Sequence, residues 1–222
     1  MPDAGGCCTG LRVEFGQARS GAVGQVPIPG LMNSGVGFPE GTSLPNGSAS
    51  PGGWAASLSY PGPNPVYAAG AGIIPSPPWV APNSDSAWLS LAPNDVNAPP
   101  GTAWISIPFD LTGLDPATAH IFGRWTADDV GHDIFLNGNP TGNAQVGGFS
   151  AWSDFSISPG DGDTFLPGIN YLTFQVENGG ASNNPAGLRW EILSATAAAV
   201  PESSTCAMLA IAGFAAFRRR RA

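Results

Sequence analysis

Apolar and polar residues alternate with a period of two across much of the chain between residues 103 and 192. The first run has apolar residues at positions 105, 107, 109 and 111, separated by Ser106, Pro108 and Asp110. Such alternation is typical of a β-strand with one buried face. The same pattern recurs at residues 121–125, 134–136, 155–157, 172–176 and 188–192. The pattern therefore predicts six strands.

Turn-forming residues separate these strands. Asn137-Gly138, which ends one strand, is among the strongest hairpin signals. The chain has 31 Gly and 23 Pro in 222 residues without a collagen period, which favours turns and long loops over helices. The strand spacing predicts an all-β fold, a jelly-roll-like antiparallel β-sandwich.

The first half of the chain is less regular. Residues 54–60 and 87–91 are strand candidates, and the prolines between them impose an extended, loop-like backbone. We expect residues 24–100 to add outer strands and loops, packed by Trp54, Trp79 and Trp88, to one domain of residues 24–196. The alternation places Trp190 in the core, and we expect Trp88 to be more exposed.

Two motifs in the second half carry a resemblance. Residues 136–138 read Leu-Asn-Gly, and residues 167–172 read Pro-Gly-Ile-Asn-Tyr-Leu and lead towards Asn178. This arrangement resembles the sugar-binding jelly-roll domains of large glycosidases and other galactose-binding-like modules. The resemblance covers about residues 100–195. It implies a fold more than a function, because many such modules bind nothing known.

The terminal segment, residues 197–222, has three features in a fixed order: a Val-Pro-Glu signature, an apolar run from 206 to 217 and an arginine cluster. This order resembles the PEP-CTERM sorting signal, although Ser203 replaces the usual second proline. As a helix, the run would span about 18 Å, too short for the ~30 Å hydrocarbon core of a membrane. The residues that match the signal are Val200, Pro201, Glu202, Arg218, Arg219, Arg220 and Arg221.

The sorting resemblance implies a location and a partner. It implies an exported protein of the bacterial cell envelope or extracellular space, held transiently at the membrane by a short hydrophobic helix, with the arginines on the cytoplasmic side. An exosortase-type membrane enzyme would process the tail. We expect the tail to be dispensable for folding, because its apolar run has no alternation that would join a sheet.

The amino-terminal segment, residues 1–23, lacks the basic and apolar regions of a signal peptide. Residues 10–15 share four of six positions with residues 187–192. One interpretation is that they are the last strand of a preceding repeat, so that the sequence begins inside a longer protein. The alternative is that they add an edge strand to the one domain present.

Charge and motifs exclude several functions. All eight basic residues are arginines, and before the terminal cluster four arginines face sixteen carboxylates, a formal charge of −12. Such a chain repels phosphate backbones, which argues against a nucleic-acid partner. There is no Gly-x-Ser-x-Gly, His-Glu-x-x-His or phosphate-binding loop motif. His120 and His132 fall on predicted strands, so we predict no catalytic residue and no enzyme.

Binding of calcium or of a sugar remains as candidate chemistry. Two pairs of aspartates in predicted loops carry the oxygen atoms that Ca²⁺ prefers, and otherwise no cofactor is expected. Indole faces stack on sugar rings, and neighbouring carboxylates can bind hydroxyl groups. The calcium candidates are Asp128, Asp129, Asp161 and Asp163. The ligand-binding candidates are Trp79, Trp88, Trp125 and Trp152, with Asp128 and Asp129 beside them.

These observations predict a non-catalytic envelope or exopolysaccharide-matrix protein that binds carbohydrate. Two alternatives stay open. In the first, the domain is an accessory part of a longer glycan-active enzyme. In the second, it is a structural repeat without a ligand.

Overall fold

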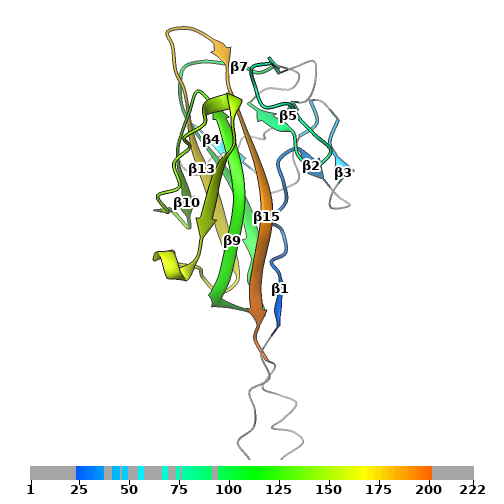
Figure 1. The fold of residues 1–222 in the computed structure, drawn as a ribbon, viewed down its shortest axis with the longest axis vertical. Coiled ribbons are helices and arrows are strands. Elements are labelled where there is room, and N and C mark those ends of the chain that lie inside the picture. Colours follow the sequence, from blue (N-terminus) through cyan, green and yellow to red (C-terminus); the bar gives the residue numbers. More distant parts are fainter. Residues whose placement is uncertain are drawn as a thin grey trace, which may run out of the picture.

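The computed structural model describes residues 24–37, 42–45, 47–49, 55–57, 67–69, 74–75, 77–91 and 95–201. Over these ranges the chain forms two main antiparallel sheets that pack face to face (Figure 1). The fold is therefore all-β and sandwich-like, as the alternation predicts. The predicted amino-terminal remnant and terminal helix lie outside the described residues. Within these ranges no helix is long and apolar enough to cross a membrane.

The first sheet is built around the two longest strands of the sandwich. Its order is β12 (Ser153–Ile157), β9 (Leu114–Asp128), β15 (Gly187–Ala199), β6 (Trp88–Ser90) and β5 (Tyr67–Ala69), and β1 (Gln25–Pro27) also pairs with β15. The second sheet has the order β11 (Asn139–Pro140), β10 (Val130–Leu136), β13 (Ile169–Asn178), β8 (Gly101–Asp110) and β4 (Ala55–Ser57).

Smaller elements connect these strands. Two short ribbons pair β2 (Val36–Gly37) with β3 (Thr42–Ser43) and β7 (Asn97–Ala98) with β14 (Asn184–Pro185). Two single-turn helices, η1 (Gly148–Ser150) and η2 (Pro159–Asp161), flank β12.

All six predicted strands are confirmed, as β8, β9, β10, β12, β13 and β15. The predicted hairpin turn is also confirmed, because Asn137 and Gly138 separate β10 from β11 with φ angles of 52° and 85°. Positive φ at both central residues is what a type I′ turn requires.

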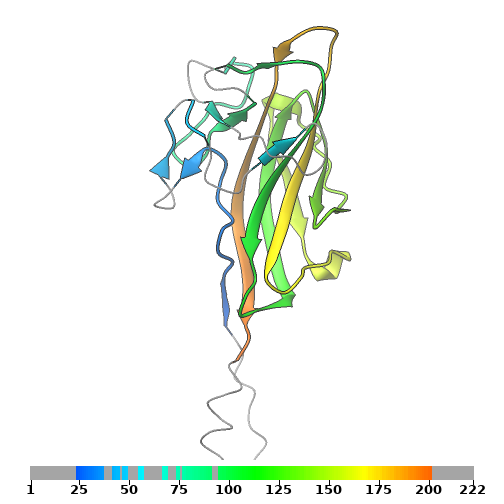
Figure 2. The ribbon, with the colours of Figure 1, turned by 180° about the vertical axis from the view of Figure 1, so that it is seen from behind.

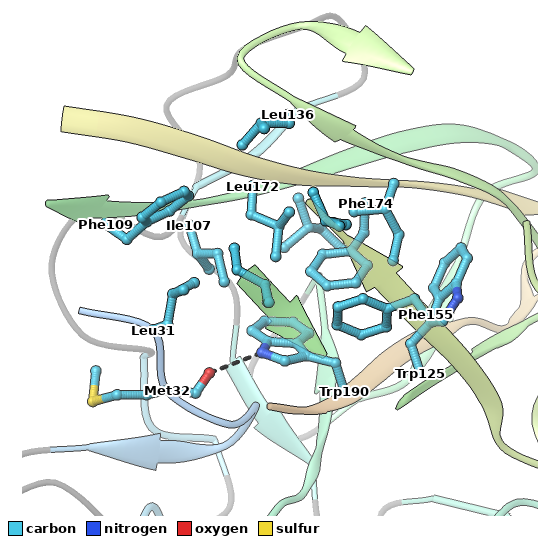
Figure 3. Packing of buried hydrophobic residues seen from close by; sticks show 14 of the residues in the cluster. Leu31, Met32, Ile107, Phe109, Trp125, Leu136, Phe155, Leu172, Phe174 and Trp190 are labelled. Atoms are coloured by element: carbon cyan, nitrogen blue, oxygen red, sulfur yellow. Dashed lines mark hydrogen bonds between the residues drawn. The ribbon is translucent and has the colours of Figure 1, made fainter. Parts of the chain in front are cut away.

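The core lies between the two sheets (Figure 3). Phe174 of β13 stacks on Trp190 of β15 with ring centroids 4.9 Å apart, and Trp125 of β9 lies 5.5 Å from Phe174. The Trp190 indole donates a hydrogen bond to the carbonyl of Met32 at 2.9 Å (Figure 3). The large aromatic rings at the centre are therefore fully buried, and the predicted core position of Trp190 is confirmed.

Gly123 allows this core to close. It lies on β9 opposite Phe155 of β12, and a Cβ at this position would overlap the Phe155 ring and the carbonyl of Glu191. The backbone of β9 can therefore approach its neighbours only because residue 123 has no side chain.

Strands from the irregular first half enter both sheets. The predicted strands at 54–60 and 87–91 contain β4 and β6, which join the second and first sheets respectively. A second, smaller cluster of buried residues, Ile74, Trp79, Trp88 and Val96, lies in this half. At the opposite end of the molecule, β1 lies beside the last residues of β15, so residues 24 and 200 leave the domain together (Figure 2).

Candidate functional site

Three aromatic residues face away from the core on adjacent strands of the second sheet. Ile105 of β8, Ile134 of β10 and Leu172 of β13 are buried in the core. Their neighbours Trp104, Phe135 and Tyr171 therefore point to the outer face, because successive side chains of a strand alternate between faces. We call these three residues the aromatic strip.

Two rings of the strip contact each other, and all three are at least partly exposed. The centroids of Trp104 and Phe135 are 5.0 Å apart in an edge-to-face arrangement. Between their strand positions, Ser106 and Thr173 form a buried hydroxyl pair at 2.8 Å. This bond gives each buried hydroxyl a hydrogen-bond partner. Tyr171, one pleat further along β13, is 46% exposed.

Polar groups on the same face lie beside the strip. Gln175 of β13 pairs with Trp104 on one side and with Asp133 on the other. No hydrogen bond to the Gln175 carboxamide is formed by any of the described residues. A free carboxamide can donate to and accept from hydroxyl groups. The face can therefore hold a flat, hydroxylated ring, with its C–H surface on the aromatic residues and its hydroxyls at the amide.

The alternation contained the signal for this site. It assigned Ile105, Ile134 and Leu172 to the core, which already required residues 104, 135 and 171 to face outward. None of the three is among the stacking residues predicted from the sequence, which were all tryptophans on other segments.

Three predicted stacking residues are buried instead. Trp79, Trp88 and Trp125 are 3%, 0% and 0% exposed, so none offers an indole face to a ligand. Trp125 lies in the main core, and Trp79 and Trp88 stack with centroids 4.3 Å apart. The expectation that Trp88 is more exposed than Trp190 is therefore wrong. The indole N–H of Trp88 donates a hydrogen bond to the carbonyl of Val80 at 2.7 Å. This bond holds the ring against the loop of residues 77–87, which covers it.

Trp152, the fourth candidate, is partly exposed on the outer face of the first sheet. The guanidinium carbons of Arg124 and Arg189 lie 4.7 and 4.8 Å from its ring centroid. Contacts of this length are cation–π interactions. The indole of Trp152 is therefore already engaged by two cations of the protein.

Glu191 joins these two arginines. Its carboxylate accepts hydrogen bonds from Arg124 Nε at 2.7 Å, Arg189 Nη2 at 3.3 Å and Ser86 Oγ at 2.7 Å. Burial acts to raise the pKa of Glu191, but bonds from Ser86, Arg124 and Asn83 outweigh it and hold the pKa below its usual value. Burial also lowers the pKa of Arg189 to about 10. Both groups therefore stay charged near neutral pH.

Asp128 and Asp129 follow one another at the end of β9. Asp128 is only 6% exposed, and its Oδ1 has no hydrogen-bond partner within the described part of the chain. Burial, with the neighbouring Asp129, raises the pKa of Asp128 to about 7. Asp129 Oδ2 accepts the backbone N–H of Gly179 at 2.7 Å. Because Asp128 is buried, it cannot bind the hydroxyl groups of a sugar at the surface, and this predicted role is wrong.

Asp161 and Asp163 lie at the other end of β9. The pairing of β12 with β9 runs from Ser153 opposite Trp125 to Ile157 opposite Ile121, so η2 lies beyond the Ile121 end. Seven residues of strand, about 23 Å, separate Ile121 from Asp128. Asp161 and Asp163 accept hydrogen bonds from the Ser158 hydroxyl and backbone amide. The four predicted calcium ligands therefore cannot form one site.

The described residues include both histidines of the chain and many of its carboxylates. Among those described, no three His, Cys, Asp or Glu side chains lie close enough together to hold a metal ion. His120 contacts Ser156 at 3.2 Å, and His132 contacts the Glu177 carboxylate at 2.7 Å. Neither aspartate pair by itself has the oxygen ligand count that calcium requires.

Comparisons with known proteins add little to this geometry. No family model and no curated protein matches the chain. Among solved structures, an exo-β-1,3-galactanase from Phanerochaete chrysosporium, determined with β-1,3-galactotriose, is similar with 14% identity and a TM-score of 0.30. The match covers 68% of this chain and 30% of the galactanase chain, so this chain spans less than a third of that protein. A score this low carries no argument about ligands.

Proposed function

We propose that this chain is an exported, non-catalytic polysaccharide-binding domain of the galactose-binding-like, jelly-roll type, acting at the bacterial envelope or in the exopolysaccharide matrix. The observation that carries the proposal is the aromatic strip, three outward-facing rings on the adjacent strands β10, β13 and β8. Exposed apolar side chains gathered on one face of a domain often mark a binding site.

A neutral polysaccharide suits the strip best. The flanking side chains are Asp133, the carboxamide of Gln175 and the His132–Glu177 pair. The body of the chain is strongly acidic, so an anionic glycan would be repelled unless a cation bridged it. The predicted calcium ligands lie in two separate places, and Asp129, Asp161 and Asp163 accept hydrogen bonds from the protein itself. Both observations argue against such a bridge.

Delivery by the terminal tail belongs to the same proposal. Val200 and Pro201 are exposed directly after β15, where a following segment would be accessible to an exosortase-type processing enzyme. The tail would then hold the domain at the membrane transiently, with the domain on the outer side.

Affinity electrophoresis of the purified protein in gels containing neutral or acidic polysaccharides tests the binding. Tyr171→Ala removes an exposed ring with little effect on packing. It should weaken binding about tenfold, or ~1.4 kcal/mol. Phe122→Ala is the matched control, because Phe122 is a partly exposed ring on the outer face of the first sheet.

Three outcomes decide between the proposals. Retardation by neutral polysaccharides that Tyr171→Ala reduces and Phe122→Ala does not supports the strip. Retardation only by acidic polysaccharides, abolished by a chelator, would overturn the choice of a neutral ligand. If no polysaccharide retards the protein, the domain is a structural repeat rather than a binding module.

A further inference from the structure

A cavity of about 280 Å³ opens on the other side of the molecule, between the segment 31–36, the loop 83–86 and β15. Its apolar lining comes from Leu31, Met32, Val36 and Ile192. Its polar lining comes from Asn33, Ser84 and Asp85. The cavity therefore combines an apolar floor with a polar rim, and it contains no residue of the aromatic strip.

Side-chain hydrogen bonds fix the walls of the cavity. Asn33 donates from Nδ2 to the carbonyl of Asp85 at 3.0 Å and accepts from the backbone N–H of Ile192 at 2.7 Å, so one carboxamide ties two walls together. Asn83 Oδ1 accepts the backbone N–H groups of Asp85 and Ser86 at 2.9 and 2.8 Å. The rim therefore has a defined backbone conformation.

The buried side chains Arg189 and Glu191 of the first sheet hold the loop 81–86 by hydrogen bonds. Arg189 donates to Ser86 Oγ at 2.7 Å and to the carbonyl of Ala81, and Glu191 accepts from Asn83 Nδ2 at 3.1 Å. Burying an ion pair contributes little net stability compared with apolar packing, but it specifies one arrangement of its neighbours. The network therefore prepares the rim before any ligand arrives, as in most small-molecule sites.

The carboxylate of Asp85 supplies the chemistry of the rim. Asp85 is exposed, and the hydrogen bond to its side chain that the structure gives is from Ser84 Oγ to Oδ1 at 3.1 Å. A carboxylate has about four acceptor positions, so it can accept from two further hydroxyl groups. The aliphatic floor meanwhile suits a C–H surface. A pyranose ring has both an apolar face and a hydroxylated edge.

We infer that this cavity is a second ligand site that takes a single neutral sugar residue, such as a chain end or a branch. The inference rests on the proposed function, in which the domain binds a polysaccharide. The size agrees, because a cavity near the lower limit for ligand sites, about 300 Å³, admits a small ring rather than an extended chain. The strip would then hold the body of the polymer and the cavity one of its residues.

Saturation-transfer NMR on the full chain with the methyl glycosides of galactose, glucose and mannose tests the cavity directly. At least one glycoside should receive saturation from the protein. Asp85→Asn keeps the shape of the rim and should weaken that binding tenfold or more. Ser84→Tyr fills the opening and should abolish it. Tyr171→Ala, on the strip, should leave it unchanged.

Each failure has a distinct meaning. If no glycoside binds at tens of millimolar, or if binding survives Ser84→Tyr, the cavity is not a sugar site. If methylammonium binds in an Asp85-dependent way while the glycosides do not, the ligand class is wrong. Polysaccharide retardation that Tyr171→Ala reduces, together with no glycoside binding that Ser84→Tyr abolishes, would uphold the proposed function while overturning the second site.

Discussion

The outer faces of the two sheets differ in which side chains they bury and which they expose. On the first sheet, the charged Arg189 and Glu191 are buried beneath the loop of residues 77–87. On the second sheet, Trp104, Phe135 and Tyr171 remain partly exposed. Buried charge and exposed aromatic surface are the two informative departures from the usual distribution of residues. On the first face, a loop covers the charged groups and holds them in a network, whereas on the second face the aromatic rings stay accessible to solvent, which is the basis of the binding that we propose for the strip.

Removing the carboxylate of the first face should give the largest effect. Glu191→Ala leaves the buried Arg189 guanidinium without its counter-charge, which should lower the free energy of unfolding by about 3–5 kcal/mol. Urea denaturation followed by tryptophan fluorescence measures it. Asp154→Ala, which removes an exposed carboxylate opposite Arg124, is the control. A loss below about 1 kcal/mol would mean that the network does not hold the fold.

Asp128 should make stability depend on pH. Its pKa in the folded protein, about 7, lies above the unfolded value near 3.9, so the folded state binds the proton more tightly. The contribution of Asp128 to stability is therefore fully present below about pH 4 and is lost as the pH rises to about 7. Asp128→Asn should remove this loss, stabilising the protein by roughly 3 kcal/mol at pH 8 and by little at pH 4.

Thermal melting of Asp128→Asn and the unmodified protein across pH 4–9 checks this expectation. Asp163 has a raised pKa as well, mainly through burial, so a residual slope of the same sign should remain in the variant. Parallel melting curves for the two proteins at every pH would contradict the assignment to Asp128.

The aromatic strip should matter less for folding than for binding. Trp104→Ala removes a partly exposed ring, so it should cost about 1–2 kcal/mol of stability. Trp190→Ala, at the centre of the core, should cost about 3–5 kcal/mol. Chemical denaturation of both variants tests the difference. Equal losses would show that Trp104 is a packing residue, and the distinction between the two faces would weaken.

The smallest effect should come from the tail. Val200 donates its backbone N–H to the carbonyl of Gly113 at 2.9 Å, and this is the last such bond in the described chain. Truncation after Val200 should therefore change the melting temperature by no more than about 2 °C, corresponding to at most ~1 kcal/mol. A larger fall would show that the tail packs on the domain, against the sorting proposal.

The alternating pattern could predict the sandwich because its strands have one buried face. Ile105, Phe174 and Trp190 all lie in the core that periodicity assigned to them. Trp88 could not be placed in the same way. Its strand β6 has three residues, all buried, so period two is absent and burial depends on a loop that contributes the Val80 carbonyl.

The candidate sites differ in how far sequence could reveal them. The strip was implied by residues 104, 135 and 171 lying out of phase with core positions. The cavity was not, because Asn33, Asp85 and Ile192 come from three distant segments that only tertiary packing brings together. The hydrogen bond between the side chains of Asp128 and Trp79 likewise joins residues that are distant in the sequence, so it has no local signature.

The positions of residues 24 and 200, at the two ends of the folded domain, have a mechanical consequence. Strand β1 pairs antiparallel with the end of β15, Gln25 opposite Ala198 and Pro27 opposite Thr196, so residues 24 and 200 emerge side by side. Tension applied between these residues would separate β1 from β15 in the direction perpendicular to the strands, beginning at one end of the pair. Hydrogen bonds that lie perpendicular to antiparallel strands would then break one after another instead of sharing the load. Under force, β1 would peel away first, while the sheets that carry the strip and the cavity stay paired.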